Sequence, residues 1–454
     1  MRPGILVTVA FAALSWAAPV TEEKRATPPL PSTDSFYSVP DNIASYAPGA
    51  IINHRAPPSP ISAFGIDPVN IAASWQILYR TTDNLGNATA TILTVLVPVN
   101  ADFDKLLSYQ VAEDAPNINC APSYALQLES ATGGTLGTAL TQAELLLAEA
   151  ALYQGWVVVL PDHEGPNGAY LANRLAGYAT LDGIRAALQS TSLTGISIDA
   201  KVGLWGYSGG ALASAWATVL QPEYAPELTG TLVGAAFGGT VPNIYNVITT
   251  INKTPSAGII AAGMVGLAKQ YPVMATGLED HVLPEYQADF EAVLNQCFVP
   301  DLSLFNNADV INMIDNPNLW NDPVVLEIFA NNSLEYAPAP PAGLPLFVYK
   351  AVKDEVSPIA DTDDLITAYC AAGTTVEYIR DQSSTHGGLS LIGAPMALAW
   401  LIDRMNGKAA STVCSTATKY SMLLDIATLE VLPTFLLDAL KALLGGEVGP
   451  TFFG

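Results

Sequence analysis

The stretch KVGLWGYSGG at residues 201–210 decides the fold, because an apolar run there leads directly into a tight turn that carries a serine. The apolar residues 202–205 predict a buried strand, and the alanine-rich run 211–220 predicts the helix that follows. Ser208 stands at the centre of Gly-x-Ser-x-Gly, the pattern of a nucleophile on a sharp strand-to-helix turn. Glycines flank it because neighbouring side chains would collide with the crossing backbone. We interpret Ser208 as a nucleophile rather than as a chance match among small residues.

Composition excludes several classes of protein. The chain has 454 residues, of which 50% are hydrophobic and 13% charged, as expected for a globular protein with a large core. Its formal net charge of −24 argues against nucleic acid as a partner and against electrostatic docking on anionic lipid. Any contact with lipid would therefore be hydrophobic. The four scattered histidines show no metal-binding spacing, so we expect no metal and no cofactor.

The first residues have the pattern of a secretory signal. Arg2 supplies a positive charge, residues 5–14 form an apolar run, and small residues follow at 15–18. A membrane anchor is the alternative, but the run is too short to span a bilayer, and no later stretch is long enough either. We therefore expect a signal peptide over residues 1–18, a propeptide over 19–25 that ends at Lys24-Arg25, and a secreted protein.

Cysteines and glycosylation motifs fit secretion. Four cysteines in a secreted protein should pair, and three connectivities are open, with free buried thiols as the alternative. Joining the last two in the sequence leaves the first two for each other; the four are Cys120, Cys297, Cys370 and Cys414. Sequons for N-glycosylation begin at Asn87, Asn252 and Asn331.

Buried strands and helices alternate along much of the chain. Expected helices cover 141–154 and 179–189 besides the one after Ser208. The first two expected strands form an antiparallel hairpin around the turn at 84–87. The expected strands are 73–80, 89–99, 106–111, 155–160, 202–205, 232–237, 344–349 and 375–379. This pattern predicts an α/β fold with a mostly parallel sheet flanked by helices.

The pattern changes along the chain and suggests a division into parts. A Pro-rich stretch is expected to wrap the surface as an extended arm with short helical pieces, and a stretch without strong strand signals is expected to be an inserted helical lid domain. In the tail, residues 435–444 predict an amphipathic helix that packs on the core. The expected parts are the arm at 26–69, the core at 70–240 and 336–410, the lid at 241–335 and the tail at 411–454.

A serine nucleophile needs a base, and histidine is the usual one. The chain offers His54, His163, His281 and His386. In α/β-hydrolases the order along the chain is serine, acid, histidine. Of the two histidines that follow Ser208, only His386 comes after a strand, in what we expect to be a loop after the last strand. His386 is therefore the predicted base, and His163 is expected to be structural, hydrogen-bonded beside Asp162.

The acid should come from the loop after the preceding expected strand. Asp354 is the first carboxylate there and is the predicted third member, with Glu355 as the neighbouring alternative. The aspartates beyond Ser357 are expected to begin a helix, whose N-terminus favours negative charge.

These residues predict a division of labour. Ser208 attacks an acyl carbon, His386 takes its proton and later gives it to the leaving alcohol, and Asp354 orients the imidazole. The oxyanion needs two donors. One is the N–H of Gly209, the residue after the nucleophile, and the second should come from an early sheet loop, where Asp114 is the candidate.

Several motifs resemble the fungal secretory lipase family. They are SYQVAEDA at 108–115, CAPSY at 120–124, PDHEG at 161–165, LDGIR at 181–185, GYSGG at 206–210 and THG at 385–387. The resemblance covers most of the mature chain in order, but neither the Pro-rich arm nor the tail beyond residue 411.

The resemblance implies an α/β-hydrolase core with an inserted helical lid and disulfides that join Cys120 to Cys297 and Cys370 to Cys414. It also implies that Asp114 supplies the second oxyanion N–H. An aspartate there is expected to be protonated or turned away, because a carboxylate would repel an oxyanion. The resemblance leaves the substrate open among long-chain triacylglycerols, simple esters and esters of secondary metabolites.

The predicted function is therefore that of a secreted, monomeric carboxylic ester hydrolase, and foremost a lipase acting on triacylglycerols or other fatty-acyl esters. An esterase or deacylase of a soluble metabolite is the alternative. A serine peptidase of the same fold is disfavoured, since the expected lid is mostly apolar and offers few charged anchors for a peptide terminus. A binding protein on a hydrolase scaffold usually lacks the serine or the histidine, and both are present here.

Overall fold

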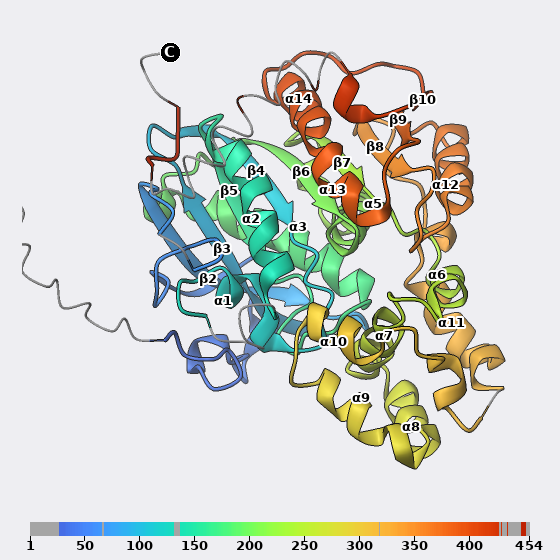
Figure 1. Cartoon of the computed structure of the whole chain (residues 1–454). Coiled ribbons are helices and arrows are strands. Elements are labelled where there is room, and N and C mark those ends of the chain that lie inside the picture. Colours follow the sequence, from blue (N-terminus) through green and yellow to red (C-terminus); the bar gives the residue numbers. More distant parts are fainter. Residues whose placement is uncertain are drawn as a thin grey trace, which may run out of the picture.

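A ten-stranded sheet organises the molecule (Figure 1). A computed structural model describes residues 27–65, 68–130, 137–316, 318–425 and 446–450, and the single positions 428 and 434. The expected signal peptide, propeptide and helix at 435–444 lie outside the described residues.

The strands follow the spatial order β1-β2-β3-β5-β4-β6-β7-β8-β9-β10. The first three join antiparallel to their neighbours, and from β5 to β10 every neighbouring pair is parallel. Their bounds are β1 Ile51–Arg55, β2 Ala73–Thr82, β3 Ala88–Val97, β4 Asp102–Gln110, β5 Trp156–Pro161, β6 Lys201–Tyr207, β7 Leu232–Gly238, β8 Leu346–Ala351, β9 Val376–Asp381 and β10 Ser415–Lys419. The predicted class, a mostly parallel sheet flanked by helices, is confirmed.

Helices bury both faces of the sheet, which explains the apolar runs in its central strands. In β6, Leu204 packs into one core layer and Trp205 into the other, because successive side chains point to opposite faces. One layer holds α3 (Asn173–Gln189), α5 (Gly209–Tyr224) and α12 (Ile359–Ala371), and the other holds α2 (Ala139–Leu152) and α14 (Ala394–Met405). Short helices α1 (Pro122–Ala125), α4 (Thr191–Thr194) and α13 (His386–Ile392) lie between these elements.

A helical insert separates β7 from β8. It holds α6 (Ile244–Ile251), α7 (Gly258–Ala268), α8 (Pro272–His281), α9 (Gln287–Val293), α10 (Phe298–Leu304) and α11 (Pro323–Asn331). Most of these helices group beside the sheet, at the lower right of Figure 1. The insert falls in the predicted lid region, whose boundaries at 241 and 335 stay predictions.

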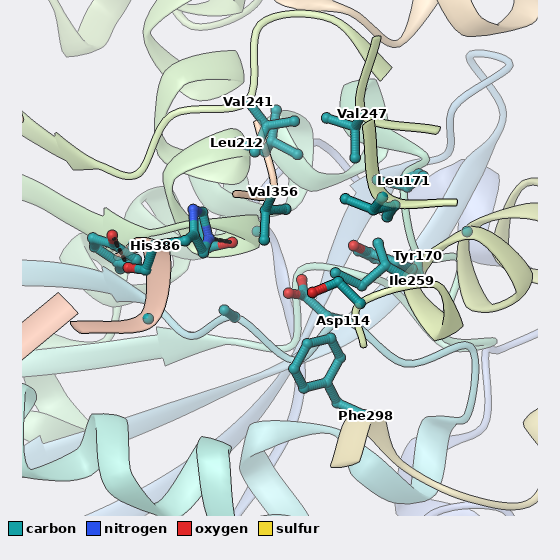
Figure 2. Close-up of a pocket in the computed structure, with 18 of the residues that line it drawn as sticks. Asp114, Tyr170, Leu171, Leu212, Val241, Val247, Ile259, Phe298, Val356 and His386 are labelled. Carbon is teal, nitrogen blue, oxygen red and sulfur yellow. Dashed lines mark hydrogen bonds between the residues drawn. The ribbon is translucent and has the colours of Figure 1, made fainter. Parts of the chain in front are cut away.

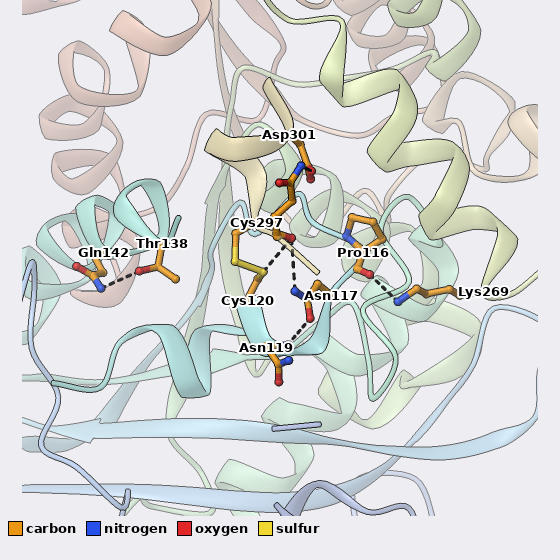
Figure 3. Close-up of a disulfide and its surroundings, with 10 residues drawn as sticks. Pro116, Asn117, Asn119, Cys120, Thr138, Gln142, Lys269, Cys297 and Asp301 are labelled. Atoms are coloured by element: carbon orange, nitrogen blue, oxygen red, sulfur yellow. Dashed lines mark hydrogen bonds between the residues drawn. A yellow bond between two sulfur atoms is a disulfide. The ribbon is translucent and has the colours of Figure 1, made fainter. Parts of the chain in front are cut away.

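A disulfide ties this insert to the loop after β4 (Figure 3). Cys120 and Cys297 are 177 residues apart in the sequence. In the chain-entropy model, closing such a loop lowers the conformational entropy of the unfolded chain and thereby stabilises the folded state by about 5 kcal/mol. Beside it, the Lys269 ammonium on the insert donates to the backbone carbonyls of Pro116 and Asn167. The second disulfide joins Cys370 to Cys414, so both pairs match the connectivity implied by the family resemblance.

Two edge strands differ from the sequence-based expectation. The arm contains the expected short helical pieces, Ser35–Tyr37 and Ile43–Ser45, but also forms β1, which pairs with β2. The tail forms β10, which pairs with β9. Every residue of β10 is exposed or half-buried, and β1 contains the polar run Asn53-His54-Arg55. Neither edge strand therefore carries the apolar pattern by which strands are recognised.

Candidate active site

Ser208 sits on a strained turn between β6 and α5, as its motif predicts. Its φ of +51° lies in the left-handed region that side chains rarely occupy. A Cβ on Gly206 would lie 2.3 Å from the carbonyl oxygen of Gly210, and one on Gly210 would lie 2.0 Å from that of Gln110. Only glycine fits at both positions, so the backbone can turn sharply and present the serine at the end of the strand.

His386 and Asp354 converge on this serine from later parts of the sheet. The Nε2 of His386 lies 2.8 Å from Ser208 Oγ, and its Nδ1 lies 2.7 Å from Asp354 Oδ2. The other carboxylate oxygen of Asp354 accepts backbone N–H bonds from Val356 at 2.9 Å and Ser357 at 2.8 Å. The structure therefore brings together the three residues that the chain order suggested.

The environment keeps Asp354 ionised. Burial alone would raise its pKa, but the hydrogen bond from His386 and the positive charge of Lys350 hold the pKa well below its usual value. An ionised carboxylate is what an imidazole that gains a proton needs beside it.

His386 occupies the first turn of a helix rather than a loop, which corrects the sequence-based expectation. It is the first residue of α13, and β9 before it is not the last strand, because β10 follows. The backbone N–H of His386 donates to Glu355 Oε2 at 2.9 Å, and its carbonyl accepts a hydrogen bond from the Tyr207 hydroxyl. Glu355, the alternative acid, thus contacts the histidine backbone, and Asp354 contacts the ring.

The other histidines lie away from Ser208. His54 is exposed on β1, and His281 pairs through Nδ1 with Asp315 at 3.0 Å. His163 is buried, and burial lowers its pKa to about 4, so it is neutral at physiological pH. Its Nδ1 has no partner among the described residues. The neighbouring Asp162 instead accepts from the backbone N–H and hydroxyl of Ser123, so the expected hydrogen bond beside Asp162 does not form at Nδ1.

The two candidate oxyanion residues lie against each other. A Cβ built on Gly209 would fall 1.8 Å from Asp114 Oδ1, so the aspartate covers this glycine and is not turned away. Asp114 is buried, with a φ of +49°, and burial raises its pKa to about 7. A substantial fraction of this side chain is therefore neutral at pH 7, in line with the first of the two expectations for an aspartate here.

A buried glutamate that sequence reasoning missed supports the segment before Asp114. Glu144 on α2 accepts the backbone N–H of Ala112 at 3.0 Å and the hydroxyl of Tyr109 at 2.9 Å. Burial raises its pKa to about 8, although both hydrogen bonds oppose this. A polar residue at a buried position of a helix was the available signal, since buried carboxyls are kept only where they find partners.

Lys350 is the second residue that sequence reasoning missed. It is fully buried in β8, and its Nζ lies 2.9 Å from Asp354 Oδ2. The available signal was a lysine between the apolar pairs Val348-Tyr349 and Ala351-Val352, four residues before the predicted acid.

A cavity of about 470 Å³ opens beside Ser208 (Figure 2). Ser208, His386 and Asp114 are among the residues that line it, and much of the remaining wall is apolar. Figure 2 shows Leu212 from α5 and Val241, Val247, Ile259 and Phe298 from the insert around this space. The site thus combines a few polar groups with a long apolar wall, which suits a ligand that carries a hydrocarbon part.

Within the ranges that the structure covers, no group of three or more histidine, cysteine, aspartate or glutamate side chains could hold a metal ion. In the same part of the chain, no helix is both long and apolar enough to cross a bilayer.

The sheet and the strand-to-helix turn that bears Ser208 define an α/β-hydrolase fold. The chain belongs to the secretory lipase family, whose model matches residues 130–412. It is 46% identical to Lipase A of Arthroderma benhamiae over 92% of this chain and 89% of that protein. It is 39% identical to Lipase 5 of Candida albicans over 87% of this chain and 85% of that one. The protein is therefore a carboxylic ester hydrolase.

Solved structures agree with this assignment. The X-ray structure of Candida antarctica lipase A superimposes with a TM-score of 0.80 at 30% identity, covering 94% of this chain and 99% of that one. A rice cell wall degrading esterase, LipA of Xanthomonas oryzae, has a TM-score of 0.55 at 16% identity, covering 80% and 96%, and shows the shared fold alone.

Proposed function

We propose that the protein hydrolyses fatty-acyl esters, triacylglycerols foremost, through a triad of Ser208, His386 and Asp354 and a covalent acyl-enzyme. The observation that carries the proposal is the hydrogen-bonded path from Asp354 through His386 to Ser208, with separations of 2.7 and 2.8 Å, beside a largely apolar cavity that Ser208 and His386 line.

The chemistry follows from this geometry. Ser208 Oγ attacks the acyl carbon while His386 Nε2 accepts the hydroxyl proton. The tetrahedral intermediate collapses as His386 gives that proton to the leaving alcohol, and the acyl group stays on Ser208. Water then attacks the acyl-enzyme, again with His386 as base, and releases the fatty acid and the free serine. Asp354 remains ionised and stabilises the imidazolium in both halves of the reaction.

We propose the backbone N–H groups of Gly209 and Asp114 as the two oxyanion donors. Gly209 is the first residue of α5, so its N–H belongs to the positive end of a helix dipole. Asp114 lies against it, and the raised pKa of its carboxyl favours the neutral side chain that an oxyanion tolerates.

The substrate class rests on the cavity and on the relatives. The apolar wall favours a fatty-acyl chain over a peptide, and the relatives carry the name lipase. The insert supplies part of that wall, which supports its proposed role as a lid. A deacylase of a soluble ester uses the same triad, and chain-length preference separates the two candidates.

Secretion as a monomer is part of the proposal, and the name of the family supports secretion. Among the proposed glycosylation sites, Asn87 and Asn331 are exposed. Asn252 is half-buried, and its side-chain nitrogen donates to Asp309 at 2.8 Å. Because a sequon must be accessible to be glycosylated, we expect the exposed Asn87 and Asn331 to be modified before Asn252.

The test compares the secreted wild type with Ser208→Ala. Both are assayed on butyrate, octanoate and palmitate nitrophenyl esters and on emulsified triacylglycerol. We expect hydrolysis of the longer esters and of triacylglycerol, and a fall in kcat of at least about 10⁴-fold in the variant. Ser45→Ala, at an exposed serine, is the matched control. Activity confined to butyrate would favour the soluble-ester candidate, and full activity of Ser208→Ala would overturn the triad.

A further inference from the structure

Lys350 places an ammonium group in the dry interior behind the proposed triad. Its side chain and that of Asp354 are both fully buried, and Nζ lies 2.9 Å from Asp354 Oδ2. The same Nζ donates at 2.7 Å to the backbone carbonyl of Thr240, where the chain leaves β7 for the insert. A Ser-His-Asp triad does not require such a cation, because the aspartate needs only the histidine as a charged partner.

The lysine and the histidine share one oxygen of Asp354. Oδ2 faces Lys350 Nζ at 2.9 Å and His386 Nδ1 at 2.7 Å, while Oδ1 accepts the two backbone N–H groups of the following loop. Four donors thus match the roughly four acceptor sites of a carboxylate and leave it no other orientation. Lys350 also cancels part of the negative charge that the imidazole ring experiences.

The remaining charged groups around this pair come from several elements. Besides Asp354, the carboxylates of Glu355 and of Asp361 on α12 act on Lys350. Burial lowers the pKa of Lys350, and these three carboxylates oppose that change. On the histidine side, Tyr207 of β6 lies with its ring centre 5.5 Å from that of His386, and Glu355 accepts the histidine N–H. Asp381 of β9 faces Tyr207. Of these groups, Asp354, Glu355 and Asp361 act directly on Lys350.

We propose that Lys350 is a positioning and charge-compensating residue that fixes the Asp354 carboxylate and keeps His386 an unprotonated base further into the acid range. An uncompensated aspartate would stabilise the imidazolium more strongly, so protons would inactivate the base at higher pH. The inference rests on the proposed triad and adds to it a residue that sets the acid limit of activity.

The experiment measures kcat/KM against pH for wild type, Lys350→Met and Lys350→Gln. Both variants remove the charge, and glutamine retains a donor. We expect the acid limb of both profiles to move to higher pH by roughly 1 unit, a loss of about tenfold below the midpoint. Lys353→Met removes an exposed lysine from the loop that follows β8 and should leave the acid limb of the pH profile in place.

A second readout separates this charge effect from misfolding and from failure of the triad. The downfield proton on His386 Nδ1 is followed by NMR during an acid titration, and its midpoint should rise in the charge-removing variants. Unmoved midpoints and acid limbs in Lys350→Gln would overturn the inference while an active wild type left the proposed function intact. An inactive wild type would overturn the proposed function itself, and the NMR midpoint would still decide the role of Lys350.

Discussion

At the residue scale, the adjacent residues Gly209 and Gly210 are needed for different reasons. A Cβ on Gly210 would meet the backbone of Gln110, whereas the three atoms nearest to one on Gly209 all belong to the side chain of Asp114. We predict that Gly210→Ala destabilises the protein by about 2–4 kcal/mol, because backbone cannot move aside. Gly209→Ala should fold with little change in Tm and lose about 100-fold in kcat, because the displaced Asp114 no longer frames the oxyanion. Thermal unfolding and steady-state kinetics separate the two, with Gly343→Ala as a control in open space. Equal effects of both substitutions would contradict this division.

Glu144 gives a second prediction at this scale. Glu144→Ala removes the acceptor for the Ala112 N–H and should lower kcat about tenfold or more with a smaller change in KM, because the oxyanion segment loses its support. Glu144→Gln keeps one acceptor oxygen and should restore most of kcat. Tyr109→Phe, which removes the other partner, serves as the comparison. A rise in KM alone would instead indicate a role in binding.

Ser208, His386 and Asp354 could be proposed from the sequence because their order along the chain and their place after strands are fixed by the fold. Lys350 and Glu144 could not, because their roles depend on burial. A sequence shows a charged residue but not which carboxylate or N–H faces it across the interior.

At the scale of elements, the two disulfides should have separable effects. The paired substitution Cys120→Ala/Cys297→Ala releases the insert from the loop after β4. We predict a loss of about 2–5 kcal/mol of stability and new proteolytic cleavage within the insert. Cys370→Ala/Cys414→Ala removes the disulfide that closes a shorter loop, between cysteines 44 residues apart in the sequence. This substitution should lower Tm without exposing the insert. Limited proteolysis with mass mapping distinguishes these outcomes, and cleavage at the same sites in both variants would contradict them.

Elements differ in how well sequence predicts them, for a physical reason. Strands such as β5 and β6 are buried on both faces and form apolar runs that are easy to recognise. The edge strands β1 and β10 each pair with one neighbour only, and most of their side chains are exposed or half-buried. Pairing with β2 and β9, rather than an apolar pattern of their own, therefore determines that they form strands.

At the scale of the whole molecule, buried carboxyls link stability to pH. Burial raises the pKa of Asp114 and Asp162 to about 7 and that of Glu144 and Glu149 to about 8. A carboxyl whose pKa is raised in the folded state stabilises that state. This stabilisation is complete at pH values below the pKa of the same group in the unfolded chain, near 4, and is lost as pH rises through the pKa of the folded state. Asp354 has the opposite sign, and its contribution is lost only in stronger acid. We predict that Tm falls steadily from pH 5 to pH 8.5, the more so because the net charge of −24 grows more repulsive.

Glu149→Gln provides the matched variant for this prediction. Glu149 is 1% exposed, and its Oε2 has no hydrogen-bond partner within the described part of the chain. A neutral amide of the same size should make the fall in Tm less steep between pH 5 and 8.5, at constant ionic strength. A wild-type Tm that rises with pH would contradict the assignment of these carboxyls as protonated groups.

Three hydrogen bonds join residues 448–450, near the C-terminal end, to segments of the chain that are synthesised much earlier. Val448 donates its N–H to Asn70 at 2.8 Å and accepts that of Val99 at 2.9 Å, and Asn100 bonds to Pro450, which lies 350 residues away in the sequence. At roughly 5 to 20 residues per second, a ribosome needs about 20 to 70 s to make the intervening chain. Throughout that interval Asn70, Val99 and Asn100 lack these partners, although β3 itself can already pair with β2 and β5. The segments that flank this part of the sheet, at residue 70 and at residues 99–100, are therefore among the last in the nascent protein to complete their native hydrogen bonds.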